Sequence, residues 1–203
     1  MSNSFVWLTL FLLGCYHGLN PGMGWLFAVA LGYQDRSTLA VVRAIVPLTL
    51  GHVISVAIVV LVATFAAVQL PHKAVHVAAA AILIGFGVYR LVRARHIRWV
   101  GMRVGFWGLT LWGFLMSSAH GAGLMLLPMV MPMSGSAGAA RGAFTMSWLM
   151  VGVHTLGYVV TVAAVALLVY MKFGVRFLRT AWLNVDAVWA AALILTGIIA
   201  FLT

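Results

Sequence analysis

The sequence predicts an all-α integral membrane protein: six transmembrane helices, arranged as two inverted three-helix repeats, with helices 1 and 4 broken. Three observations lead to this fold. The 203-residue chain is 65% hydrophobic and only 7% charged, with a mean hydropathy of +1.13, which is typical of membrane proteins and not of soluble domains. Its apolar runs are long enough to cross a bilayer. Its two halves also share one spacing of histidine, glycine and proline.

Six apolar runs contain few or no charged residues, and a spanning helix needs about 20 apolar residues. The runs are Phe5–Tyr33, Ala44–Leu70, Ala74–Tyr89, Val104–Met133, Gly142–Met171 and Ala181–Leu202. The third run is short, so its helix is expected to extend to Val92. We expect one membrane domain, with the first three-helix repeat over residues 1–98 and the second, inverted repeat over residues 99–203.

The distribution of basic residues predicts the orientation of the helices. The net charge is +10, and Asp35 and Asp186 are the two acidic residues. Ten basic residues follow the first, third and fifth runs: Arg36, Arg43, Arg90, Arg93, Arg95, Arg98, Arg103, Lys172, Arg176 and Arg179. The other gaps contain Lys73 and Arg141. Because basic loops stay in the cytoplasm, loops 1, 3 and 5 are expected there. Both termini would then be extracytoplasmic, in a bacterial-type inner (cytoplasmic) membrane.

One motif occurs in both halves of the chain. Each half has a His-Gly pair, then a proline, then a second histidine 34 or 35 positions after the first. The residues are His17-Gly18, Pro21 and His52 in the first half, and His120-Gly121, Pro128 and His154 in the second. A unit of three helices has an odd number of crossings, so its second copy would enter the membrane from the opposite side. Inverted repeats of this kind build transporters with a substrate site near the bilayer midplane.

The first and fourth runs are longer than one bilayer crossing requires, and helix breakers lie near their middles. Asn20-Pro21-Gly22-Met23-Gly24 interrupts the first run, and Gly121, Gly123 and Pro128 interrupt the fourth. Proline removes a backbone donor and glycine permits a bend. We expect two broken helices whose free carbonyls line a substrate site. A packing kink is the alternative.

The candidate site is built on four histidines that lie deep in their predicted spans. Ionisable residues at this depth usually face the interior of a helix bundle. Imidazole binds Ni, Co, Zn or Cu and also relays protons near neutral pH, whereas structural hydrogen bonding is the alternative role. The candidate metal ligands are His17, His52, His120 and His154. The other candidate substrate-binding or coupling residues are Asn20, Pro21, Met23, Ser55, Ser117 and Tyr158.

Helical spacing suggests how the hydroxyl groups among these residues act. Ser117 precedes His120 by one helical turn, and Ser55 follows His52 by one turn. At this spacing the hydroxyl groups can orient the imidazole rings, as supporting groups do around metal ions. Bonding back to carbonyls of their own helix is the alternative.

The first half resembles the nickel/cobalt efflux family of the LysE-type transporter superfamily. The resemblance lies in His17-Gly18-Leu19-Asn20-Pro21-Gly22-Met23 and in Thr49-Leu50-Gly51-His52. Met23 stands where that family has a second histidine, and Asn20 stands where an acidic residue is common. The resemblance implies a six-helix exporter of metal ions. The superfamily also includes amino-acid exporters.

The sequence therefore predicts a secondary transporter, not an enzyme, that exports a transition-metal cation, either Ni/Co-like or softer, and has no resident cofactor. No nucleotide-binding motif occurs, so an ion gradient would supply the energy. The alternatives are export of a small neutral or anionic solute or amino acid, and a haem- or metal-binding membrane subunit. The expected partners are membrane lipids and the transported ion or solute, with no nucleic acid. An oligomer or a partner subunit is left open.

Overall fold

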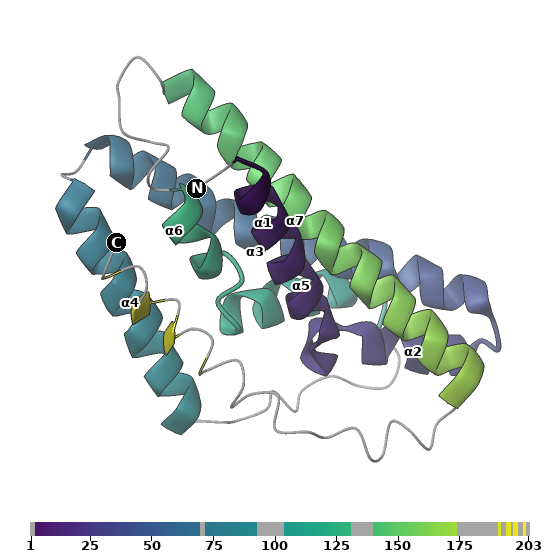
Figure 1. Cartoon of the computed structure of the whole chain (residues 1–203). Coiled ribbons are helices and arrows are strands. Elements are labelled where there is room, and N and C mark those ends of the chain that lie inside the picture. Colours follow the sequence, from purple (N-terminus) through teal and green to yellow (C-terminus); the bar gives the residue numbers. More distant parts are fainter. Residues whose placement is uncertain are drawn as a thin grey trace. The chain divides into compact units, whose positions relative to one another are not determined.

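The computed structural model describes residues 3–69, 72–92, 104–130 and 140–173, together with positions 191, 194, 195, 197, 198 and 201. Within these residues the chain is helical apart from short turns, and it contains no strand (Figure 1). The predicted all-α class is therefore confirmed for this part of the chain. Most of the sixth predicted run lies outside the described residues, as do Asp186 and the arginines at positions 93, 95, 98, 103, 176 and 179.

The first predicted run forms two helices separated by a break. Helix α1 covers Asn3–Leu19, the short 3₁₀ turn η1 covers Pro21–Met23, and helix α2 covers Trp25–Gln34. The Asn20 side chain accepts a hydrogen bond of 2.9 Å from the Gly22 N–H, as an N-cap does. Gly24 has φ +110°, a conformation that side chains rarely adopt. The expected break thus lies where the sequence predicts it.

The next two helices are long and continuous. Helix α3 covers Thr38–Gln69 and helix α4 covers His72–Val92, which confirms the predicted extension to Val92. Because α3 begins at Thr38, before the predicted start at Ala44, His52 lies near the middle of this helix instead of near its start. Pro47 lies inside α3 and cannot donate to the carbonyl one turn earlier.

The second half repeats the order of a broken helix followed by a long one. Helix α5 covers Phe106–Ala119, a turn covers residues 120–123, and the 3₁₀ turn η2 (Leu124–Leu126) leads into α6 (Leu127–Val130). Helix α7 covers Ala140–Leu168 and ends in a π-helical turn, η5, over Val169–Phe173. The second break is therefore also present. The opposite orientation of the two repeats remains a prediction.

Contacts divide the chain into two compact units. The first unit contains the described parts of residues 1–54, 97–119 and 152–183, and the second those of residues 55–96, 120–151 and 184–203. Each unit takes segments from both predicted repeats, 1–98 and 99–203. The two units group residues that are in contact in space, whereas the repeats are defined by similarity along the sequence. The repeat boundaries therefore remain a prediction.

In the first unit, α1 and α7 approach so closely that only glycine fits between their backbones. A Cβ atom on Gly14 would overlap the backbone carbonyl of His154, and one on Gly18 would meet the carbonyl of Tyr158 at 2.8 Å. Gly14 and Gly18 form a small-xxx-small pattern, which permits close helix packing in membranes. This contact therefore sets how near the side chains of α1 come to His154 and Tyr158.

Helices α3 and α5 use glycine in the same way. A Cβ on Gly51 would overlap the Thr110 carbonyl, and one on Gly113 would overlap the Leu48 carbonyl. Around these contacts lies the apolar core of the first unit, which includes Trp25, Val29, Val41, Leu48, Leu109, Val162 and Val169. Close backbone contacts thus hold α1 against α7 and α3 against α5.

The second unit has its own core and its own polar contact. Ala63, Ala79 and Leu127 are buried together. The Thr64 hydroxyl donates to the Val60 carbonyl at 2.8 Å, and it lies 3.3 Å from the Ser147 hydroxyl. This unit therefore links α3 and α7 through hydroxyl groups.

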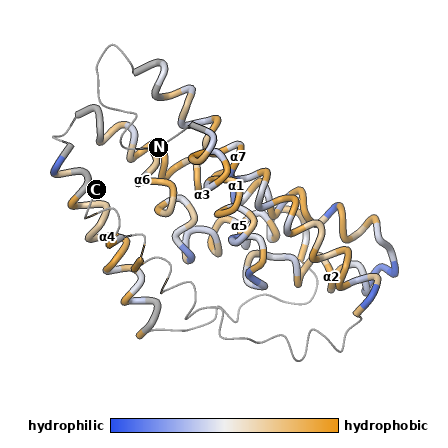
Figure 2. The backbone as a smooth tube through the Cα atoms, viewed as in Figure 1, coloured by the Kyte–Doolittle hydropathy of each residue, from blue (hydrophilic) through white to orange (hydrophobic). Residues whose placement is uncertain are grey.

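The exposed face of α3 is an apolar stripe. Its exposed large hydrophobic residues from Val46 onward are Val46, Leu50, Ile54, Ile58, Leu61, Val62 and Phe65, spaced three or four residues apart for the most part. Figure 2 colours much of the described part of the chain as hydrophobic, with strongly hydrophilic residues in short stretches. Among the described helices, Thr38–Ala66 and Phe144–Phe173 are long and apolar enough to cross a membrane.

Gly14→Ala should lower the free energy of unfolding of the purified protein by about 1–3 kcal/mol, the usual result of overpacking a tight contact. The added methyl group would push α1 away from the His154 carbonyl. The matched control is Gly152→Ala in α7, where a Cβ meets nothing within 4 Å. Thermal unfolding midpoints would measure both changes. Equal midpoints for the two variants would contradict the close α1–α7 contact.

Candidate functional site

Three of the four predicted histidines lie together inside the first unit. His17 comes from α1, His52 from α3 and His154 from α7, and all three are fully buried. Their ring centres are 5.1 Å apart for His17 and His52, 5.9 Å for His17 and His154, and 5.5 Å for His52 and His154. We call these three residues the histidine cluster. It joins residues from both halves of the chain.

Tyr158 completes one side of the histidine cluster. Its ring stacks on His52 with ring centres 4.0 Å apart and planes inclined by 6°. Its hydroxyl donates a hydrogen bond of 2.9 Å to the backbone carbonyl of Met23, inside the first helix break. Tyr158 therefore connects the imidazole rings directly to the break between α1 and α2.

Ser117 contacts His52, a residue with which the helical spacing did not pair it. Helix α5 ends at Ala119, so Ser117 and His120 do not lie on consecutive turns of one helix. Instead, the Ser117 Oγ lies 2.9 Å from His52 Nδ1, and its hydroxyl donates to the sulfur of Met23 at 4.0 Å. The Ser117 hydroxyl and His52 Nδ1 thus share a hydrogen bond, and His52 Nε2 is buried without a hydrogen-bond partner among the described residues.

Several buried polar atoms of this unit have no hydrogen-bond partner among the described residues. They include His52 Nε2, both ring nitrogens of His154, Asn20 Nδ2, Thr49 Oγ1 and Thr155 Oγ1. The Leu10 carbonyl lies beside the His154 ring, but outside hydrogen-bonding geometry. An unsatisfied buried polar group destabilises a fold by about 1–3 kcal/mol. Such groups in one region are typical of a ligand site.

The ring separations are close to those of imidazoles that share one metal ion. A metal–nitrogen bond is about 2.0 Å, and the ring centre lies about 1.1 Å beyond the nitrogen, so two bound rings are about 5.1 Å apart in tetrahedral and about 5.4 Å in trigonal geometry. Within the described part of the chain, no three His, Cys, Asp or Glu side chains already form a metal-binding group. The rings would have to rotate to bind an ion.

The carbonyls at the first break are not free, contrary to the expectation from sequence. The Trp25 indole N–H donates to the Leu19 carbonyl at 3.1 Å, and the Trp112 indole N–H donates to the Gly22 carbonyl at 3.0 Å. The Met23 carbonyl accepts from Tyr158. A buried carbonyl needs a hydrogen-bond donor, and aromatic side chains supply it here. The side chains near the break, more than its carbonyls, are therefore available to a ligand.

The remaining predicted residues divide between the two units. Asn20 is buried and caps the break, and Pro21 begins the 3₁₀ turn. His120 and Ser55 belong to the second unit, where both are buried. Their participation in one site with His17 remains a prediction.

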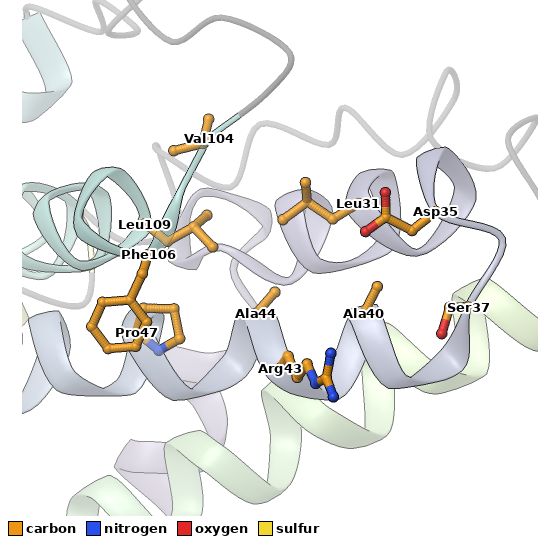
Figure 3. Close-up of a pocket in the computed structure, with 10 residues that line it drawn as sticks. All are labelled: Leu31, Asp35, Ser37, Ala40, Arg43, Ala44, Pro47, Val104, Phe106 and Leu109. Atoms are coloured by element: carbon orange, nitrogen blue, oxygen red, sulfur yellow. The ribbon is translucent and has the colours of Figure 1, made fainter.

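A separate pocket of about 340 Å³ opens in the first unit, near the turn between α2 and α3 (Figure 3). Its polar lining residues are Asp35 at the end of α2, and Ser37 and Arg43 at the start of α3. Apolar residues, among them Pro47 and Phe106, line the rest. The side chains of Asp35 and Arg43 are exposed. The pocket thus offers one acidic and one basic group to a small ligand.

Sequence reasoning missed the residues that hold the histidine cluster in place. Gly14 was not singled out, although the Gly14-x-x-x-Gly18 pattern next to His17 was a usable signal. No sequence signal links Trp112 to Gly22, because the two residues are 90 positions apart.

Tyr158→Phe should destabilise the protein by about 1–3 kcal/mol, because it leaves the buried Met23 carbonyl without a donor. It should also alter ligand binding at the histidine cluster. The matched control is Tyr33→Phe, which removes a similar bond of 2.8 Å to the Tyr170 carbonyl. Tyr33→Phe should change thermal stability alone. Equal effects of both variants on binding would contradict the role of Tyr158.

No protein-family model, curated protein or solved structure matches this chain.

Proposed function

We propose that the chain is a multi-pass membrane transporter that moves a transition-metal cation through a site built on His17, His52 and His154. The observation that carries the proposal is the burial of these three rings within 5.1–5.9 Å of one another. Imidazole nitrogen binds Ni, Co, Zn and Cu. Buried imidazoles in an otherwise apolar bundle suit a cation that passes through the protein.

The arrangement of polar and apolar residues supports a place in the membrane. Polar side chains such as His52, Ser117 and His154 are buried, while the exposed stripe of α3 is apolar. From Val46 to Phe65 this stripe rises by about 29 Å at 1.5 Å per residue. The hydrocarbon core of a bilayer is about 30 Å thick. Soluble proteins rarely expose apolar surface of this extent.

The two helix breaks support transport in preference to permanent binding. Broken helices at the midplane, one in each repeat, are typical of secondary transporters that rock one repeat against the other. We infer export driven by an ion gradient, with proton exchange through imidazole as the natural coupling step. The distribution of basic residues along the sequence supports termini that lie outside the cytoplasm, in a bacterial-type inner membrane.

The lack of a neighbouring carboxylate argues against an enzyme. A hydrolytic zinc site pairs the metal with a carboxylate base, as in the His-Glu-x-x-His proteases. Asp35 is the acidic residue among the described residues, and it is exposed at the turn after α2. Among the described residues, the histidine cluster therefore offers ligands without a carboxylate base beside them.

His17→Ala, His52→Ala and His154→Ala should each reduce metal transport into proteoliposomes more than about tenfold, since even supporting residues around metals contribute 10–100-fold. Each variant should remain folded and inserted. His76→Ala is the matched control, because the sequence places His76 near the end of a predicted span. Wild-type transport in the three cluster variants would defeat the site assignment.

The pocket near Asp35 favours a second candidate function, export of a small zwitterion such as an amino acid. Its volume of about 340 Å³ suits a small ligand. Arg43 would bind a carboxylate and Asp35 an ammonium group. The pocket lies in the first unit, as does the histidine cluster.

Arg43→Gln and Asp35→Asn separate the two candidates. If the cargo is a zwitterion, both changes should reduce amino-acid export from loaded vesicles more than about tenfold, because each removes a charged hydrogen bond of about 1.5–3 kcal/mol. If the cargo is a metal cation, the histidine variants should have the larger effect on transport. Because we propose a metal cation as the cargo, we expect the histidine variants to reduce transport more than Arg43→Gln and Asp35→Asn do.

A further inference from the structure

Resting on the membrane location in the proposed function, we infer that the pocket between α2, α3 and α5 binds the headgroup of a membrane phospholipid, phosphatidylethanolamine. Arg43 binds the phosphate of this lipid and Asp35 binds its ammonium group. The apolar residues of the pocket contact the first part of the acyl chains. The pocket then serves a lipid instead of a transported amino acid, and the histidine cluster serves the transported cation.

The charged groups of the pocket match a ligand with one negative and one positive group. The lining contains one base, Arg43 on α3, and one acid, Asp35 at the end of α2 (Figure 3). Both side chains are exposed, so a ligand can reach them. A guanidinium group binds phosphate through two parallel hydrogen bonds, and a carboxylate accepts from an ammonium group. Because Asp35 repels a purely anionic headgroup, the pocket favours a headgroup that carries both charges.

The pocket lies at the level expected for lipid headgroups in the proposed membrane. The exposed apolar stripe of α3 begins at Val46, and its length matches the hydrocarbon core of a bilayer. Arg43 precedes Val46 by three residues, which is about 4.5 Å along the helix axis. The headgroup layer on each side of the core is about 5–8 Å thick, so Arg43 lies within it. Pro47, which also lines the pocket, lies at the edge of the hydrocarbon.

Aromatic residues beside the pocket indicate the same level. Phe106 lines the pocket and is 47% exposed, and its neighbour Trp107 at the start of α5 is 74% exposed. Tryptophan is enriched at membrane–water interfaces, because its ring is apolar and its N–H needs a polar partner. An exposed tryptophan therefore marks this end of α5 as an interfacial position.

Apolar surface next to the charged groups distinguishes a lipid from a free solute. The volume of about 340 Å³ lies at the lower end of the range of about 300–1,000 Å³ that is typical of small-molecule sites. Such a pocket suits a headgroup, while the acyl chains lie outside it. Phe106, and Val46 next to Pro47, are exposed beside the pocket and offer contacts to these chains. A free amino acid has no acyl chains and gains nothing from this surface.

Asp35 also distinguishes between zwitterionic lipids. A carboxylate is a hydrogen-bond acceptor, and the ammonium group of phosphatidylethanolamine has three N–H donors. The quaternary ammonium group of phosphatidylcholine has the same charge but no N–H. Charge-assisted hydrogen bonds are stronger than contact between charges alone. We therefore expect phosphatidylethanolamine to bind more tightly than phosphatidylcholine.

Native mass spectrometry of the purified full chain measures this selectivity directly. The protein is incubated in detergent with equal amounts of phosphatidylethanolamine, phosphatidylcholine and phosphatidylglycerol, all with the same acyl chains. Free phosphoethanolamine, a headgroup without chains, is the fourth probe. The variants are Asp35→Asn, Arg43→Gln and Arg36→Gln. Arg36 is the matched control, because it is an exposed arginine next to Asp35 and does not line the pocket.

The wild-type chain should retain phosphatidylethanolamine about fivefold more than either other lipid, which is the effect of one interaction between exposed charges. Asp35→Asn should reverse the selectivity toward the anionic phosphatidylglycerol, since Arg43 still binds phosphate and the repelling carboxylate is gone. Unfolding cannot produce such a reversal. Arg43→Gln should weaken binding of all three lipids, and Arg36→Gln should leave the selectivity unchanged.

Equal retention of the three lipids would overturn the inference, as would an Arg36→Gln effect as large as that of Arg43→Gln. Tighter binding of free phosphoethanolamine than of the lipid would assign the pocket to a soluble zwitterion and would also overturn it. These outcomes leave the proposed metal transport intact, because the histidine cluster does not line the pocket. Wild-type metal transport in the histidine variants, measured separately in proteoliposomes, would defeat the proposed function but not the lipid site.

Discussion

The candidate site depends on the backbone contact between α1 and α7. Gly14 and Gly18 let the two helices meet at the carbonyls of His154 and Tyr158. His17 lies between these glycines in sequence, so the same contact determines how far its ring is from His154 and Tyr158. Larger residues at the two glycines would separate the rings without changing any of them. The geometry of the histidine cluster is thus a consequence of helix packing.

The helix break and the histidine cluster form one hydrogen-bonded system. Tyr158 stacks on His52 and donates to the Met23 carbonyl, while Ser117 contacts both His52 and the Met23 sulfur. A ligand that moves the His52 ring would therefore disturb the break between α1 and α2. In the transporter that we propose, this coupling would link occupation of the site to movement of a half-helix.

The sequence was sufficient for features that are local in the chain. Composition predicted the helical class, and Asn20-Pro21-Gly22 predicted the first break, because capping and proline effects act within a few residues. The histidine pairing across the two halves followed from the repeat. Contacts between distant segments could not be predicted. Ser117 contacts His52, which is 65 positions away in the sequence. Aromatic N–H groups donate to the backbone carbonyls that were expected to be free. Such contacts depend on helix rotation and distance, which periodicity does not determine.

The central claim is that one ion binds to imidazoles from α1, α3 and α7 together. X-ray absorption spectroscopy of the Cys15→Ser protein, which lacks the free Cys15 thiol and is loaded with one equivalent of Cu(I) or in parallel Zn(II), tests it most directly. The account predicts three imidazole ligands at about 2.0 Å, falling to two when His154 is replaced by alanine. A spectrum with at most one imidazole, or one unchanged in the His154→Ala protein, would contradict it.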